Sequence, residues 1–113
     1  MRVAAIQMRS GLHRARNVED AAALITLAAR DGATFILTPE MTNVVDSHPK
    51  RLFASLPGEA QLAEVEQFAA LADKLGIHLV IGSMALALPE ENGLQRAANR
   101  SYFFGPDGNI VSR

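Results

Sequence analysis

Two segments with helical periodicity lie between three apolar runs of strand length, and this alternation restricts the chain to few folds. The runs span residues 2–8, 34–40 and 77–84, and the last could continue to Leu88. Near-continuous apolar runs are typical of strands that are covered on both faces. Two right-handed βαβ units would make the three strands parallel. The alternation therefore predicts an α/β domain built on a parallel sheet.

The helical segments have recognisable ends. The first starts near Val18, with Asn17 expected as its N-cap and Gly32 as the glycine that stops it. The second runs from Glu59 to the stop at Gly76. Residues 41–58, between the second strand and this helix, show no period and contain two prolines, so we expect a long loop there.

The pattern changes after the third strand. Residues 89–93 predict a turn, and residues 97–104 a further strand. The Gly-Pro-Asp-Gly sequence at 105–108 is a strong turn signal, and a return strand starts at residue 109. This antiparallel tail either extends the sheet or begins a second one. Because the chain stops inside the return strand, we expect residues 1–113 to be a single incomplete domain.

Composition excludes several classes of protein. The chain has no cysteine, which rules out disulfides, thiolate metal sites and a cysteine nucleophile among these residues. A net charge of -1, a pI near 6.3 and 5% aromatic residues argue against nucleic-acid binding. No apolar run approaches the roughly 20 residues that cross a bilayer, and no secretory signal is evident. We therefore expect a cytoplasmic protein that binds neither nucleic acid nor membrane.

No metal or cofactor site is expected either. His13, His48 and His78 are isolated from one another and from acidic residues at ligand spacing. No glycine-rich phosphate loop followed by lysine occurs.

Glu40 directly follows the second strand and is the main candidate for a catalytic residue. Open parallel sheets bind ligands at the carboxyl ends of their strands. Pro39 has no N–H, so strand pairing should end there and leave Glu40 on a stiff mount. From position alone, Glu40 is either a structural acid with satisfied hydrogen bonds or a site residue.

Three segments, taken in order, resemble the nitrilase or carbon–nitrogen hydrolase superfamily. Residues 3–8 are similar to its first strand, and residues 28–40 to its helix end, Gly-Ala pair, apolar strand and Pro-Glu. Residues 99–111 resemble its Asn-led strand, Pro-x-Gly turn and return strand. Each segment alone is a weak signal, but the three in order are specific. The resemblance covers essentially the whole chain, as the N-terminal part of such a domain.

The resemblance implies a fold and a chemistry. The fold is the N-terminal part of a four-layer αββα sandwich, with βαβαβ followed by antiparallel strands. The chemistry is hydrolysis of a non-peptide carbon–nitrogen bond by a Glu-Lys-Cys triad, in which Glu40 is the general base on the cysteine. The lysine and the cysteine would lie beyond Arg113, and Lys50 and Lys74 lie in the wrong segments. The chain alone is therefore expected to be inactive.

The remaining expectations concern ligands and assembly. The substrate would be a small-molecule amide, with an ω-amide or deaminated-peptide amide favoured, and the complete protein a homo-oligomer without a cofactor. Thr42 and Asn43 are expected as substrate-binding residues, although ordinary loop polarity explains them as well. Asn99 is interpreted as an anchor of its strand through backbone hydrogen bonds.

A second interpretation is a non-catalytic α/β binding or structural module, in which Glu40 is a surface acid. The absence of a nucleophile favours it, whereas a chain that stops inside a strand argues against it. In either case, the uncovered sheet face and edge of half a sandwich should make the isolated chain marginally stable and prone to associate.

Overall fold

The computed structural model describes all 113 residues. Its elements, in chain order, are β1 (Val3–Ala5), α1 (Arg14–Arg30), β2 (Phe35–Leu37), α2 (Pro49–Ser55), the 3-10 helix η1 (Glu59–Gln61), α3 (Ala63–Leu75), β3 (His78–Glu91), β4 (Leu94–Phe104) and β5 (Ile110–Ser112). None of the helices combines the length and the apolar character that crossing a membrane requires.

All strands belong to one five-stranded sheet of order β1-β2-β3-β4-β5. β1, β2 and β3 are parallel, and Phe35 of β2 pairs with Val3 on one side and His78 on the other. β4 is antiparallel to β3, and β5 is antiparallel to β4. The predicted parallel start is confirmed, and the antiparallel tail extends the same sheet.

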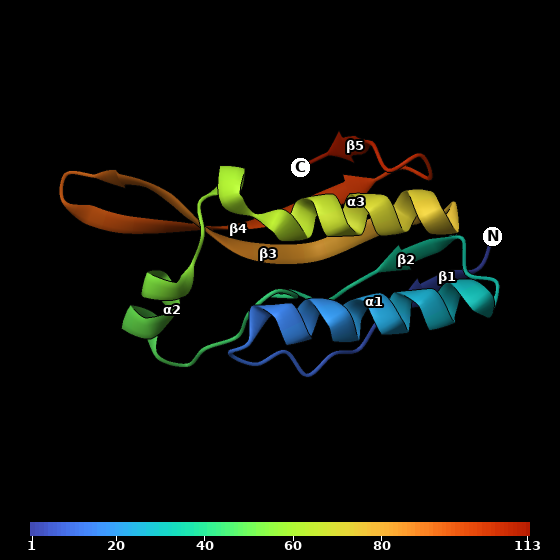
Figure 1. Ribbon diagram of the computed structural model, residues 1–113, viewed down its shortest axis with the longest axis horizontal. Coiled ribbons are helices and arrows are strands. Elements are labelled where there is room, and N and C mark those ends of the chain that lie inside the picture. The colour runs from blue at the N-terminus through green and yellow to red at the C-terminus, as the bar shows by residue number, and fades with distance from the viewer.

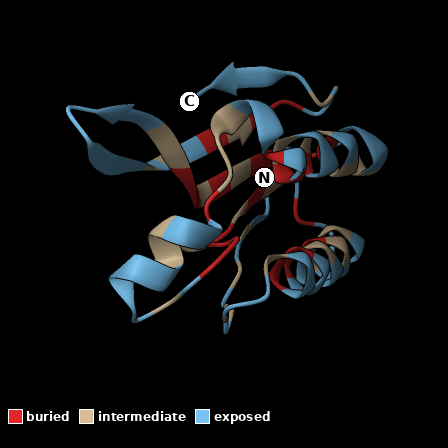
Figure 2. Ribbon diagram, turned by 60° about the vertical axis from the view of Figure 1, so that its left-hand side comes forward, coloured by how far each residue is buried: buried red, intermediate tan, exposed pale blue.

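Two helices, α1 and α3, lie side by side over one face of the sheet (Figure 1). Ile25 of α1 and Phe68 of α3 are buried against Ile36, Leu79 and Phe104 of the strands. Burying one such side chain contributes roughly 1.5–3 kcal/mol. In Figure 2 the buried residues accordingly gather between strands and helices.

The opposite face of the sheet is left partly uncovered. Phe35, His78 and Phe103 form an aromatic cluster on it, with ring centroids 5.9 to 6.3 Å apart. Val3, in the same row as Phe35, is 52% exposed. One helical layer and one sheet are thus present, which is half of the expected four-layer sandwich.

The β3–β4 hairpin extends beyond the helical layer (Figure 1). Its tip has Asn92 and Gly93 at φ 53° and 74°, the left-handed conformation of a tight hairpin turn. The turn predicted over residues 89–93 is confirmed only at Asn92 and Gly93, because β3 continues to Glu91 and β4 begins at Leu94.

The expected N-cap at Asn17 is wrong. α1 begins earlier, at Arg14, with His13 at the N-cap position. Asn17 is a buried residue inside the helix, and its side chain binds neighbouring loops instead of the helix end. The predicted stop is confirmed, because Gly32 follows the C-cap with φ 90°.

The expectation of a continuous loop over residues 41–58 is also wrong, because α2 lies within it. Pro49 stands in the first turn of α2, where its missing N–H costs no hydrogen bond. None of the seven residues of α2 is buried, so no apolar period marks this helix in the sequence. β2 ends at Leu37, just ahead of the chain-breaking Pro39.

The uncovered sheet face predicts self-association of the isolated chain. We expect Val3→Lys to raise the dissociation constant by about tenfold or more, because the substitution would bury a charge in the apolar contact. Sedimentation velocity over a concentration series measures this. Leu27→Lys is the matched control, since Leu27 is similarly exposed, at 57%, but lies on α1. Equal effects of the two substitutions would contradict association through the sheet.

Candidate active site

Glu40 lies in a turn directly after β2, at the carboxyl end of the parallel strands. Its side chain is exposed to solvent. The next residue, Met41, has φ 56°, which is uncommon for a residue with a side chain and costs of order 1–3 kcal/mol. The surrounding structure must therefore hold this turn in place.

Hydrogen bonds from β3 hold the residues that lead from β2 into this turn. The Thr38 N–H donates to the Val80 carbonyl at 2.9 Å. The Thr38 hydroxyl accepts from the Gly82 N–H at 3.1 Å, and the Ser83 N–H donates to the Pro39 carbonyl at 3.2 Å. The chain thus stays bound to β3 for two residues after regular pairing ends.

Gly82 makes this close approach possible. A Cβ atom at position 82 would lie 1.9 Å from the Thr38 carbonyl oxygen, so no other residue fits without a backbone shift. The register of β3 against β4 is also irregular here, between Ile81 and Met84. Gly82 and this bulge therefore let the chain that carries Glu40 lie directly against β3.

Ser83 holds the far side of the turn. Its hydroxyl accepts from the Met41 N–H at 2.9 Å, and its carbonyl accepts from the Thr42 N–H, also at 2.9 Å. Ser83 is itself buried, at 3% exposure. Ser83 thus binds the backbone both before and after Glu40, and these hydrogen bonds hold Met41 in its unusual conformation.

Thr42 is fully buried, and its polar atoms all bind within the chain. Its hydroxyl lies 2.7 Å from the Thr38 hydroxyl and donates to the Pro39 carbonyl at 2.7 Å. Its carbonyl accepts from the Ser10 hydroxyl at 3.0 Å. Thr42 closes the turn around Glu40.

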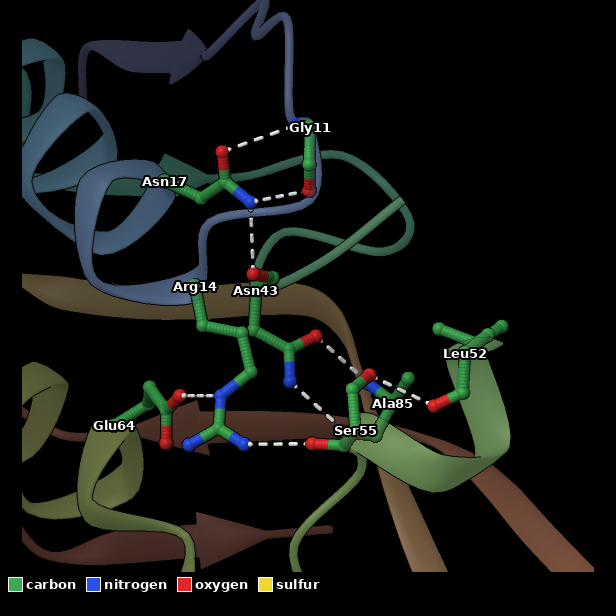
Figure 3. A network of polar contacts seen from close by, with 8 residues as sticks. All are labelled: Gly11, Arg14, Asn17, Asn43, Leu52, Ser55, Glu64 and Ala85. Atoms are coloured by element: carbon green, nitrogen blue, oxygen red, sulfur yellow. Dashed lines mark hydrogen bonds and ion pairs between the residues drawn. The ribbon is translucent and has the colours of Figure 1, made fainter. Parts of the chain in front are cut away.

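The side chain of Asn43 forms hydrogen bonds with β3 like those that a neighbouring strand would form. Its side chain donates to the Ala85 carbonyl and accepts from the Ala85 N–H, both at 2.9 Å (Figure 3). Its own carbonyl accepts from the Asn17 amide at 2.9 Å, and Asn17 also binds both backbone groups of Gly11. A buried amide therefore joins the loop after Glu40 to α1 and to β3.

A second group of contacts in Figure 3 joins the three helices. The Arg14 guanidinium of α1 binds the Glu64 carboxylate of α3 at 2.8 Å and the Ser55 carbonyl of α2 at 3.2 Å. Glu64 is 5% exposed, and its other oxygen has no hydrogen-bond partner. This network supports the layer beneath the turn without touching Glu40.

One side chain binds the Glu40 carboxylate directly. The Asn99 amide of β4 donates to Glu40 Oε1 at 2.6 Å. The interpretation of Asn99 as a backbone anchor missed this contact. No sequence signal links these residues, which lie 59 positions apart: Glu40 follows β2 and Asn99 lies on β4, which is not a neighbour of β2.

A cluster around Glu59 lies apart from Glu40. Glu59 accepts hydrogen bonds from Arg100, Tyr102 and Arg113 at 2.5, 2.9 and 3.3 Å. Those from Arg100 and Tyr102 hold the pKa of the Glu59 carboxyl below its ordinary value. Burial and the contact with Glu59 raise the pKa of Tyr102 to about 12. The cluster borders a cavity of about 810 Å³ that Glu40 does not line.

The loop after Asn43 is held by an ion pair. Arg51 donates to both carboxylate oxygens of Asp46, at 2.5 and 2.7 Å, and the His48 N–H donates to the same group. The hydrogen bond from Arg51 is the main cause that lowers the pKa of Asp46 from 3.8 to about 2.

The structure does not bring a second catalytic group to Glu40. Lys50 and Lys74 are exposed on α2 and α3, and the chain has no cysteine. No group of three or more histidine, cysteine or acidic side chains could hold a metal ion.

Comparison with known proteins shows which family the sequence resembles. The sequence matches the family described as carbon-nitrogen hydrolase over residues 2–113. It is 32% identical over 112 residues to an omega-amidase of Danio rerio, covering 97% of this chain and 37% of that protein. The chain therefore spans little more than a third of that relative.

Solved structures show the same fold. An amidase from Nesterenkonia sp. has a TM-score of 0.75 at 23% identity, over 99% of this chain and 41% of its own. The C. elegans NitFhit protein has a TM-score of 0.77 at 19% identity, over 97% of this chain and 26% of its own. One structure of the Nesterenkonia amidase is of a Glu-to-Gln variant with acrylamide added at the active site cysteine. The predicted fold class, the N-terminal part of a nitrilase-like sandwich, is confirmed.

The Asp46 contacts predict a pH-dependent contribution to stability. Because the pKa of Asp46 in the folded chain, about 2, lies below the ordinary 3.8, this contribution is present above pH 3.8 and is lost as the pH falls through 2. Asp46→Asn should lower the thermal midpoint at pH 7, and the difference should shrink as the pH falls through 2. Circular dichroism melts measure this. Asp20→Asn on the exposed side of α1 is the control, and a gap at pH 2 as large as that at pH 7 would contradict the assignment.

Proposed function

This chain belongs to the carbon–nitrogen hydrolase family, and on that premise we propose that it is the N-terminal portion of an amidase in which Glu40 is the general base. One observation carries the proposal. Glu40 follows β2 at the carboxyl end of the parallel strands, on a turn that β3 holds by several backbone and side-chain hydrogen bonds. A general base has to be held within hydrogen-bond reach of the proton that it removes.

The proposed reaction hydrolyses an amide through an acyl-enzyme. Glu40 takes the proton of a cysteine thiol, and the thiolate attacks the amide carbon. Glu40 returns the proton to the departing ammonia. It then removes a proton from the water that cleaves the thioester and passes it to the departing thiolate, so a carboxylic acid is released and the thiol is restored. A lysine stabilises the negative charge that forms on the carbonyl oxygen. We place the cysteine and the lysine beyond residue 113, so these residues alone should show no turnover.

The substrate and setting belong to the same proposal. Similarity to an omega-amidase supports a small amide substrate, and an ω-amide or deaminated-peptide amide is our choice. We further propose that the complete protein is a cytoplasmic homo-oligomer that needs no metal or cofactor.

Thr42 and Asn43 are proposed to act on the position of Glu40. Both were expected as substrate contacts, and that remains a prediction. Both side chains are fully buried, and their polar atoms bind Pro39, Thr38 and Ala85. This arrangement supports a role in fixing the turn more than direct contact with substrate.

A non-catalytic module is the second candidate. The exposure of Glu40 and the absence of cysteine favour it. In that case Glu40 would be a surface acid whose only task is to bind Asn99. The two candidates differ in the residues that they require after position 113, because the enzyme needs a lysine shortly beyond it and a cysteine further on.

Substitution of Glu40 tests the proposal. In the complete hydrolase, Glu40→Gln should lower kcat for a small amide by about 100-fold to 10,000-fold, the usual contribution of a general acid–base. Steady-state ammonia release measures the effect. Glu19→Gln, on the exposed side of α1, is the matched control and should leave kcat unchanged. Wild-type kcat in Glu40→Gln would overturn the role assigned to Glu40.

A further inference from the structure

We propose that Asn99 is a positioning residue for Glu40, whose amide holds Oε1 and leaves Oε2 to exchange the proton. This inference rests on the proposed function, since it specifies how the general base is oriented. The Asn99 amide donates to Oε1 at 2.6 Å, and no other side chain or backbone group binds the Glu40 carboxylate. Glu40 also takes part in no ion pair.

The hydrogen bond between Glu40 and Asn99 crosses a strand that would separate the two residues in a regular sheet. Glu40 follows β2 and Asn99 lies on β4, with β3 between them. Strands two places apart in a sheet are separated by about 9.5 Å. Here the turn lies directly against β3, because Gly82 has no side chain and the β3 register shifts between Ile81 and Met84. The bulge therefore serves to bring the carboxylate across β3 to Asn99.

The position of Asn99 relative to the turn is fixed by a second connection. Asn99 pairs with Ala85 across the β3–β4 hairpin. Both backbone groups of Ala85 bind the side chain of Asn43, which comes three residues after Glu40 (Figure 3). The loop of residues 40–43 is thus hydrogen-bonded to the hairpin at two places: Asn43 binds Ala85, and Glu40 binds Asn99.

The chemistry of an amide suits this task. An amide N–H donates to a carboxylate but carries no charge and does not titrate. Hydrogen bonds to charged groups are short and directional, so the carboxylate is restrained in one orientation. Restraint of a catalytic group in its reactive geometry lowers the barrier without changing substrate affinity.

The contact itself can be tested in the complete hydrolase by NMR. In the ¹H–¹⁵N spectrum, Glu40→Gln should move the side-chain amide resonances of Asn99, because the charged acceptor is replaced by a neutral one. Glu19→Gln should leave them in place. Asn99 resonances that are unchanged in Glu40→Gln would overturn the contact, and this measurement does not require any Asn99 variant to fold.

The role is tested by kinetics in the complete hydrolase. Asn99→Leu keeps the shape but cannot donate, and should lower kcat by about tenfold to a hundredfold with KM within about twofold. Asn99→Asp also keeps the shape but repels Glu40, so its loss should be deeper. A merely structural role would lower the thermal midpoint of the hydrolase together with kcat, whereas a positioning role lowers kcat and leaves the thermal midpoint unchanged. Gln95→Leu, on the same strand and without contacts, is the control.

The outcomes separate this inference from the proposed function. If Glu40→Gln is inactive while Asn99→Leu keeps wild-type kcat, the positioning role is wrong and the general base stands. If Asn99→Leu lowers the thermal midpoint as well as kcat, the residue acts through packing and the inference fails. Wild-type kcat in Glu40→Gln would overturn both.

Discussion

The close approach of the Thr38 carbonyl to Gly82 is the contact on which the rest of the candidate site depends. No Cβ atom fits at position 82, since it would lie 1.9 Å from that oxygen. Because the backbones meet here, Ser83 can reach the N–H of Met41, and the turn keeps a conformation that is costly by itself. A single missing side chain therefore sets where the Glu40 carboxylate can go.

Buried amides take the place of missing strands around this contact. β2 ends at Leu37, yet β3 continues to Glu91, so the backbone of β3 needs partners beyond β2. Asn43 supplies them at Ala85, and Asn17 binds the Asn43 carbonyl in turn. The segment after Glu40 has an irregular backbone, but its hydrogen bonds fix this loop as firmly as a strand.

Hydrophobic periodicity and turn residues correctly predicted those elements that depend only on residues close together in the sequence. The strands around Phe35 and Leu79, the stop at Gly32 and the position of Glu40 after β2 all came from short runs of residues. The sequence could not predict the features that depend on distant partners. Asn17 has the chemistry of a cap but serves as a buried link, and α2, whose Leu52 and Phe53 are only half-buried, is too short to show an apolar period. The hydrogen bond between Asn99 and Glu40 depends on the bulge in β3, the strand that lies between them.

The exposed carboxylate and the uncovered sheet face are two aspects of one arrangement. Asn99 and Phe103 alternate along β4 with residues that face the helices, so both belong to the uncovered side. A second layer that packs on Phe35 and Phe103 would therefore also enclose the end of the sheet where Glu40 binds Asn99. Exclusion of water strengthens the electrostatic interactions inside a site. The apolar burial that would complete the fold would thus also exclude water from the carboxylate that we propose as the general base.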